Sequence, residues 1–166
     1  EKDFAWADFD RDGFTDLAVA RKFPGSVEGG AKNLLLMNEN GVLVDRTDNY
    51  AINSSAEADL GFLQQTNDRD IKVLDIDLDG WPDLVTSTTM SDNLSARLGQ
   101  PRIYHNLGDD SNGNWLGFRF DDERIPVLFA KNGSSANPRA CAIAVGDVTN
   151  DGYPDIYFVD YDTPET

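Results

Sequence analysis

The residues most able to do chemistry in this sequence are aspartates grouped around a glycine. Residues 75–83 read DIDLDGWPD, which places four carboxylates within nine residues. The pattern recurs in residues 8–16 (DFDRDGFTD) and 147–155 (DVTNDGYPD), so the chain contains an internal repeat. We name residues 8–16 loop 1, residues 75–83 loop 2 and residues 147–155 loop 3, and number the positions in each from 1 to 9. Carboxylates this close repel one another unless a cation neutralises them.

Each loop is predicted to curl around a calcium ion. Aspartates at positions 1, 3, 5 and 9 offer side-chain oxygens, glycine at position 6 permits the turn, and the residue at position 7 can add its main-chain carbonyl. An oxygen cage without nitrogen or sulfur disfavours zinc, and its flexibility suits Ca²⁺ better than Mg²⁺. The predicted ligands are Asp8, Asp10, Asp12, Phe14 and Asp16 in loop 1, Asp75, Asp77, Asp79, Trp81 and Asp83 in loop 2, and Asp147, Thr149, Asp151, Tyr153 and Asp155 in loop 3. Up to three ions are expected, with loop 3 the weakest site because a threonine replaces the aspartate at its position 3.

Two other interpretations of the loops are less favoured. An EF-hand shares the first six positions, but it requires a glutamate at position 12, where this chain has Val19, Thr86 and Phe158. It also requires flanking helices, whereas these flanks alternate as strands. The loops could instead be plain aspartate-rich turns, but three such patterns at intervals of 67 and 72 residues are not expected by chance.

The segments around each loop predict strands. Apolar residues alternate or run together before and after every loop, so each loop is expected to join a β-hairpin. The expected strands are 3–8, 16–21, 33–38 and 42–47 in the first repeat, 70–75, 83–88, 102–106 and 116–122 in the second, and 140–147 and 155–160 in the third. At most one short helical turn is expected, within residues 56–65.

Four antiparallel strands per repeat predict an all-β fold made of β-propeller blades. The first blade is expected at about residues 3–60, the second at 68–130, and the start of a third at 138–166. About two and a half blades cannot close a ring, so the segment is expected to be part of a larger propeller. A β-solenoid is less favoured because its coils are shorter than this repeat.

The sequences ADFDRDGFTDLAV and VLDIDLDGWPDLV resemble the FG-GAP/VCBS repeats of integrin α-subunit propellers and of many secreted bacterial proteins. The following NLLLMNENGVLVDRT and RIYHNLGDD resemble the continuation of that repeat, with Asn38 corresponding to Asn106. The resemblance implies a calcium-stabilised propeller that lies outside the cytoplasm: extracellular, on the cell surface or periplasmic. It does not select one function, because the family includes adhesion, assembly and enzyme-associated modules.

Composition excludes several classes of partner. The net charge is −16, with 24 aspartates against 6 glutamates, which disfavours nucleic acid and anionic membranes as partners. No apolar run is long enough to insert into a bilayer. A single cysteine, Cys141, excludes an intrachain disulfide and is expected to be buried. The only histidine, His105, aligns with Met37 and is expected to be structural, and no catalytic residue is predicted.

Two functions of different classes remain. The favoured one is a non-enzymatic extracellular scaffold or adhesion-like module, whose partner is a protein, a glycan or the remaining blades of its own propeller. The alternative is the propeller portion of a secreted carbohydrate-active enzyme, a lyase or hydrolase whose catalytic residues lie outside this chain. Motifs in the full-length protein would separate the two.

Overall fold

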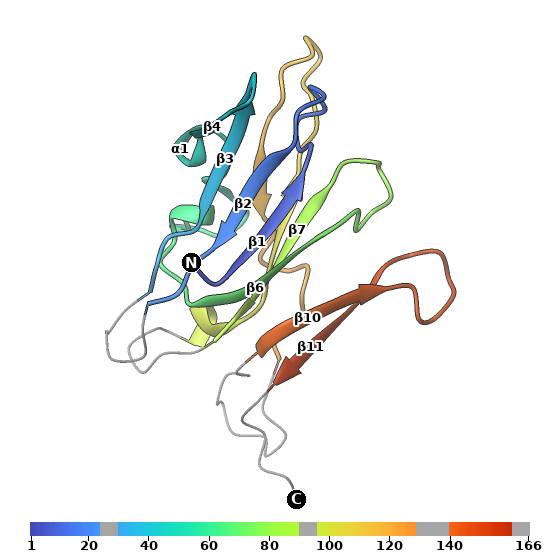
Figure 1. Cartoon of the computed structure of the whole chain (residues 1–166). Coiled ribbons are helices and arrows are strands. Elements are labelled where there is room, and N and C mark those ends of the chain that lie inside the picture. Colours follow the sequence, from blue (N-terminus) through green and yellow to red (C-terminus); the bar gives the residue numbers. More distant parts are fainter. Residues whose placement is uncertain (24–29, 90–95, 129–139, 161–166) are drawn as a thin grey trace, which may run out of the picture.

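The computed structural model describes residues 1–23, 30–89, 96–128 and 140–160, and in these ranges the chain is all-β. It forms two mainly antiparallel sheets and a separate β-hairpin (Figure 1). Sheet 1 contains β1 (Asp3–Ala7), β2 (Asp16–Ala20), β3 (Leu34–Glu39) and β4 (Val42–Asp45) in sequential order. Sheet 2 contains β6 (Asp68–Leu74), β7 (Asp83–Thr88), β8 (Arg102–Asn106) and β9 (Phe118–Phe120), and β10 (Ala140–Gly146) pairs with β11 (Asp155–Asp160).

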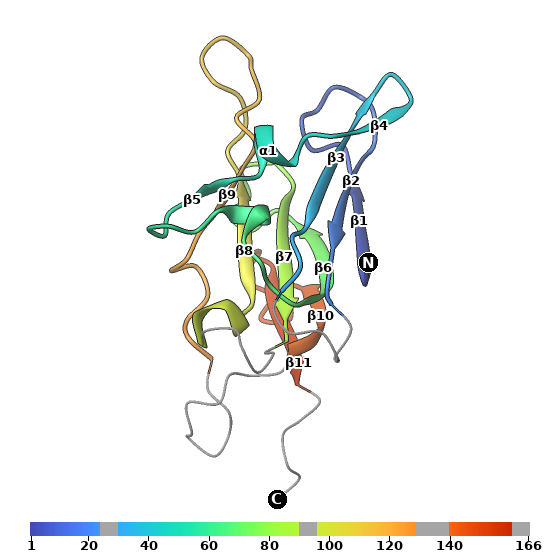
Figure 2. The ribbon, with the colours of Figure 1, turned by 90° about the vertical axis from the view of Figure 1, so that its left-hand side faces the viewer.

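The ten expected strands are confirmed in order, since each expected segment overlaps one of these strands, although β3 ends one residue later and β6 begins two residues earlier than expected. An eleventh strand, β5 (Asn53–Ser54), was not expected. It lies within the range 3–60 assigned to the first repeat, but it pairs in parallel with β9 at the edge of sheet 2 (Figure 2). Two residues of the first repeat therefore extend the second sheet.

The helical segments are short. The helix α1 (Thr47–Tyr50) and two 3₁₀ turns, Gly61–Leu63 and Ala96–Gly99, are the helical elements among the described residues. The turn at 61–63 falls where one was predicted, but α1 and the turn at 96–99 were not expected, so the prediction of at most one helical turn is wrong. The prediction of a strand over 42–47 is wrong at its end, because the Asp45 carboxylate accepts hydrogen bonds from the main-chain N–H of Thr47 at 3.0 Å and from its hydroxyl at 2.7 Å. This local turn competes with continued strand pairing.

Burial explains why the strands differ in composition. Every residue of β2 and of β7 is buried, as expected for central strands covered on both faces. In β1, by contrast, Ala5 is buried while Phe4 and Trp6 are 49% and 56% exposed. One face of β1 thus packs against the rest of the protein and the other is open. Cys141, expected to be buried, is only half-buried in β10.

Equivalent strands of successive repeats lie next to one another. β6 packs against β1 and β2 on one side and against β10 on the other, as the views in Figures 1 and 2 show. The core between sheets 1 and 2 includes the fully buried rings of Phe9, Phe62 and Phe118. A second, smaller core lies between sheet 2 and the β10–β11 hairpin and includes Val85 and Ile143.

Two aspartates connect these neighbouring strands in the same way. The Asp3 carboxylate accepts a hydrogen bond from the main-chain N–H of Ile71 in β6 at 3.2 Å, and the Asp70 carboxylate accepts one from Ile143 in β10 at 2.7 Å. Each aspartate stands five residues before its own loop, and each donor stands four residues before the next loop. The repeat therefore includes a side-chain link to the following repeat, although Ala142 occupies the corresponding position in the third.

Candidate metal centre

The three loops share one backbone conformation and lie on the same side of the molecule (Figure 1). The residue at position 4 has a φ of 57–61° in each loop, and the glycine at position 6 has a φ of 88–93°. Both values lie in the left-handed region, where a side chain at position 6 would be strained. The prediction that glycine is needed for the turn is consistent with this conformation.

The aspartates organise each loop through hydrogen bonds to its own main chain. The carboxylate at position 1 accepts the N–H of the position 6 glycine at 2.9–3.0 Å. The carboxylate at position 5 accepts the N–H of position 7, and that at position 9 accepts the N–H of position 2, all at 2.8–2.9 Å. These bonds turn the loop back on itself and leave other carboxylate oxygens available to a ligand.

Loops 1 and 2 each gather three carboxylates around one point. One oxygen from each of positions 1, 3 and 9 lies within 4.8 Å of the others in both loops. In these sets the Oδ1 atoms of Asp8, Asp75 and Asp77 are shielded from solvent and accept no hydrogen bond from the described part of the protein. A buried carboxylate oxygen without a partner is costly, so these atoms point to a bound cation. An all-oxygen donor set of this kind fits Ca²⁺.

Positions 5 and 7 do not belong to the group of converging carboxylates, unlike the other predicted ligands of loops 1 and 2. Asp12 and Asp79 are exposed and are not members of the sets formed by positions 1, 3 and 9. Their carboxylates receive the N–H groups of Phe14 and Trp81, so the described contacts of positions 5 and 7 shape the loop. Their contribution to a cation, including the position 7 carbonyl, stays a prediction.

Loop 3 keeps the backbone of the other loops without their converging carboxylates. Asp147, Asp151 and Asp155 form no such set among the described residues. Both oxygens of Asp147 accept main-chain hydrogen bonds, and one oxygen of Asp155 accepts the N–H of Val148 together with the N–H and hydroxyl of Thr149. These hydrogen bonds hold the pKa of Asp155 below its usual value. Both oxygens of Asp147 are thus engaged with the main chain, whereas Asp8 and Asp75 at the same position each keep one oxygen without a hydrogen bond from the described residues.

Comparison with known families agrees with the loop geometry. The model of the FG-GAP-like repeat matches residues 75–158, about half of the chain, from the start of loop 2 to the middle of β11. This chain belongs to the FG-GAP-like repeat family. FG-GAP repeats are typically found in extracellular β-propellers.

A search of curated proteins finds no match to this chain. Among the described residues, no helix has the length and apolar character needed to cross a membrane.

Burial and mutual repulsion shift the pKa values of the carboxylates in these FG-GAP loops. Desolvation, together with the charges of Asp16, Asp12 and Asp8, raises the pKa of Asp10 to about 6. Desolvation and the charge of Asp77 also raise the pKa of Asp83 to about 6. Without a cation, the carboxyl groups of Asp10 and Asp83 therefore retain their protons to a higher pH than ordinary aspartates do. This is expected where several carboxylates converge and no positive charge neutralises them.

Two asparagines anchor position 9 of the FG-GAP loops. The main-chain N–H of Asn38 donates to Asp16 at 2.8 Å, and that of Asn106 donates to Asp83 at 2.7 Å. Their side-chain amides donate to the carbonyl of the loop residue at position 8, at 3.0 and 3.1 Å. The sequence comparison aligned these asparagines but did not assign them a role. Their position just before a glycine-containing turn in both repeats was the available signal.

The first two FG-GAP loops also contact each other. The Arg11 side chain at position 4 of loop 1 donates a hydrogen bond to the carbonyl of Gly80 and stacks over the Trp81 ring at 4.1 Å. A guanidinium thus lies between two acidic loops. Because Arg11 belongs to loop 1 and contacts loop 2, a change in the conformation of one loop can be transmitted to the other. Its positive charge also lowers the electrostatic repulsion between the two loops.

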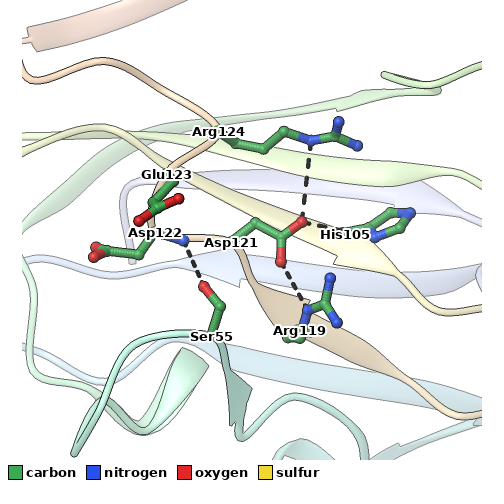
Figure 3. A pocket seen from close by; sticks show the side chains of 7 residues that line it. All are labelled: Ser55, His105, Arg119, Asp121, Asp122, Glu123 and Arg124. Carbon is green, nitrogen blue, oxygen red and sulfur yellow. Dashed lines mark hydrogen bonds and ion pairs between the residues drawn. The ribbon is translucent and has the colours of Figure 1, made fainter.

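A pocket of about 590 Å³ opens beside loop 2 of this FG-GAP chain. Its lining residues are Ser55, His105, Arg119, Asp121, Asp122, Glu123 and Arg124 (Figure 3). His105 and Arg124 reach from this pocket to loop 2, with His105 Nε2 at 3.1 Å and Arg124 Nη2 at 3.2 Å from Asp77 Oδ2. The sequence prediction treated His105 as a structural residue and did not anticipate its contact with the loop.

Proposed function

We propose that this chain is a segment of an extracellular β-propeller that binds Ca²⁺ in loops 1 and 2 and serves as a scaffold or as a protein- or glycan-interaction module. The observation that carries the proposal is the buried Oδ1 atom of Asp8 and of Asp75. Each lacks a hydrogen-bond partner among the described residues and belongs to a set of three converging carboxylates. A hard cation satisfies both the charge and the unused lone pairs.

In this proposal, positions 1, 3 and 9 hold the ion, and the exposed position 5 aspartate closes over it. The bound ion supplies the positive charge that the crowded carboxylates lack. It also fixes position 2, whose side chain lies between repeats. Phe9 at position 2 of loop 1 is fully buried, and its ring meets that of Phe118 edge-on at 5.2 Å. Calcium binding thereby stabilises the packing of one sheet on the next.

The arrangement of the sheets supports the propeller. The first strands of successive repeats, β1, β6 and β10, lie side by side, as radial repetition around an axis requires. The hydrogen bonds from Ile71 to Asp3 and from Ile143 to Asp70 repeat that step. We propose a non-catalytic role for this segment, because carboxylates engaged with calcium are not free for acid–base chemistry.

Calorimetric titration with Ca²⁺ tests this function. We expect two strong sites in the unmodified chain, and binding to loop 3 only at much higher concentration. Asp75→Asn should remove one strong site, whereas the matched change Asp147→Asn in loop 3 should leave both. Thermal unfolding should show the same pattern, since free calcium at 100 times the dissociation constant stabilises the folded state by about 2.7 kcal/mol per site. Absence of calcium binding, or equal effects of the two variants, would contradict the proposal.

A further inference from the structure

Loop 2 differs from loop 1 by a nitrogen ligand within reach. One carboxylate oxygen of Asp77, one of Asp79 and one ring nitrogen of His105 lie within 4.8 Å of one another. The nitrogen nearest to the loop is Nε2, which is 3.1 Å from Asp77 Oδ2. Asp77 therefore belongs to the set with Asp75 and Asp83 described above and also has Oδ2 beside the imidazole.

The imidazole lies between two carboxylates, with Nε2 facing Asp77 and Nδ1 facing Asp121. The His105 side chain is only 18% exposed, and both ring nitrogens are shielded from solvent without a hydrogen bond among the described residues. Behind the ring, Asp121 Oδ2 lies 3.7 Å from Nδ1, and Asp121 is itself bound by Arg119 at 2.7 Å (Figure 3). A carboxylate behind the distal nitrogen is the usual way in which a metal-binding histidine is oriented.

Loop 1 provides a control for this arrangement within the same chain. Asn38 and Asn106 occupy the same position relative to their loops, because both donate their main-chain N–H to the aspartate at position 9. The residue before Asn106 is His105, whereas the residue before Asn38 is Met37, which is buried in the core. The first repeat thus has no imidazole at the position that corresponds to His105, and the candidate ligands of loop 1 are carboxylate oxygens.

We propose that His105 gives loop 2, in addition to its Ca²⁺ site, a site for borderline divalent transition ions such as Zn²⁺ and Co²⁺ that loop 1 lacks. The inference rests on the proposed cation-binding function of the loops. Imidazole nitrogen contributes strongly to the binding of Zn²⁺ and Co²⁺ but is not a preferred ligand of Ca²⁺. His105 Nε2, Asp77 and Asp79 supply three protein ligands, and exposed Asp79 leaves the remaining positions open to water. Three ligands and an open position are common in zinc sites.

One positive group opposes an ion at this position. Arg124 Nη2 lies 3.2 Å from Asp77 Oδ2, so the guanidinium occupies the same side of that carboxylate as the imidazole. The Arg124 side chain is 35% exposed and can turn toward solvent when a cation arrives. Arg124→Gln should therefore strengthen Zn²⁺ binding without changing the binding of Ca²⁺ in loop 1.

The chain contains one histidine, so nuclear magnetic resonance of the imidazole nitrogens gives an unambiguous test. Titration with Zn²⁺ should move the Nε2 resonance to the position of a metal-bound nitrogen, whereas titration with Ca²⁺ should leave it near its starting value. If Zn²⁺ leaves the Nε2 resonance unchanged, His105 is a partner of Asp77 alone and the inference is wrong.

Replacing His105 by its counterpart in the first repeat gives a second measurement. His105→Met should weaken Zn²⁺ binding by about tenfold or more and leave the Ca²⁺ affinity of loop 2 nearly unchanged. The Ca²⁺ titrations separate the two proposals: normal Ca²⁺ binding without a zinc effect rejects only the zinc site at His105. Loss of all Ca²⁺ binding in the unmodified chain rejects the proposed calcium function.

Discussion

The side-chain amide of Asn106 donates a hydrogen bond to the main-chain carbonyl oxygen of Phe9 at 2.9 Å, across 97 positions of sequence. Asn106 is fully buried, and its amide also donates to the carbonyl of Pro82 at 3.1 Å. Its side-chain oxygen accepts the indole N–H of Trp115 at 2.8 Å. Because Phe9 belongs to loop 1 and Pro82 to loop 2, this one side chain holds the two candidate calcium loops together.

Asn106→Ala should therefore destabilise the protein more than Asn38→Ala. The first change leaves several buried polar groups without partners, and we expect a loss of about 2–3 kcal/mol. Asn38 is partly exposed, and among the described residues its side-chain amide donates to Thr15 of its own repeat, so its loss should cost about 1 kcal/mol. Chemical denaturation in saturating calcium measures both values. Equal losses would mean that the bond to Phe9 contributes nothing beyond the local anchor.

The contact of Arg11 with Gly80 and Trp81 predicts coupling between the two proposed calcium sites. We expect ion binding in loop 1 to fix position 4 and thereby the position of the guanidinium against loop 2. We expect Ca²⁺ bound to one loop to strengthen binding at the other, and Arg11→Ala to reduce this coupling. The measurement is a Ca²⁺ titration of the unmodified chain and of Arg11→Ala, each in the presence and absence of Asp75→Asn. If the affinity of loop 1 is independent of loop 2 in both backgrounds, the contact does not transmit binding.

The two aspartate links between repeats predict separate local effects. Asp70→Ala removes the acceptor for the Ile143 N–H, and Asp3→Ala removes the acceptor for the Ile71 N–H. Each variant should increase hydrogen exchange most at its own donor amide and less at the other, because Lys72 contacts both carboxylates. Equal loss of protection at both amides in either variant would indicate general unfolding instead of a local link.

Calcium and protons should compete for the same carboxylates. The pKa values of Asp10 and Asp83 are raised to about 6 in the folded protein, above the ordinary value of about 3.9. The folded state therefore binds these protons more tightly than the unfolded chain, and their contribution to metal-free stability is full below about pH 4 and is lost as pH rises through 6. Calcium affinity should rise over the same range.

Melting temperatures from pH 4 to 8, with and without Ca²⁺, test this competition. The calcium-dependent increase should be small at pH 4 and large at pH 8. Asp10→Asn should raise the metal-free melting temperature at pH 7, because it removes a repelling charge, while it weakens calcium binding in loop 1. A calcium effect that is constant across pH would show that these carboxylates do not take part.

Exposed apolar residues on β1 of sheet 1 and on β11 of the third repeat predict self-association of the chain. Phe4 and Trp6 in β1 are 49% and 56% exposed, and Tyr157 and Val159 in β11 are 72% and 43% exposed. Such surfaces favour contacts with another sheet. Trp6→Lys and Tyr157→Lys together should lower the apparent mass in sedimentation experiments. The control Val42→Lys changes a residue that is 62% exposed at the β3–β4 turn, and it should leave association unchanged.

Features close together in the sequence were predictable. The strands alternate around turns, and loop hydrogen bonds join positions only two to seven residues apart, so local spacing specifies both. The order of the four strands in each full repeat followed from the same signal. The end of β4 was missed because a side-chain turn at Asp45 outweighed the strand pattern.

Contacts between repeats could not be read from the sequence. The loop motif predicts carboxylates near a cation, but it does not say which histidine, arginine or asparagine of another strand reaches them. Arg11 meets Trp81 and Asn106 meets Phe9 only after the sheets pack in one relative position. His105 meets Asp77 within the second repeat, and only once β7 and β8 pair in one register. Shifting a strand by one residue would move every one of its side chains to the opposite face. The sequence alone thus determines the acidic loops and their strands, and the packing of one sheet against the next decides what surrounds each loop.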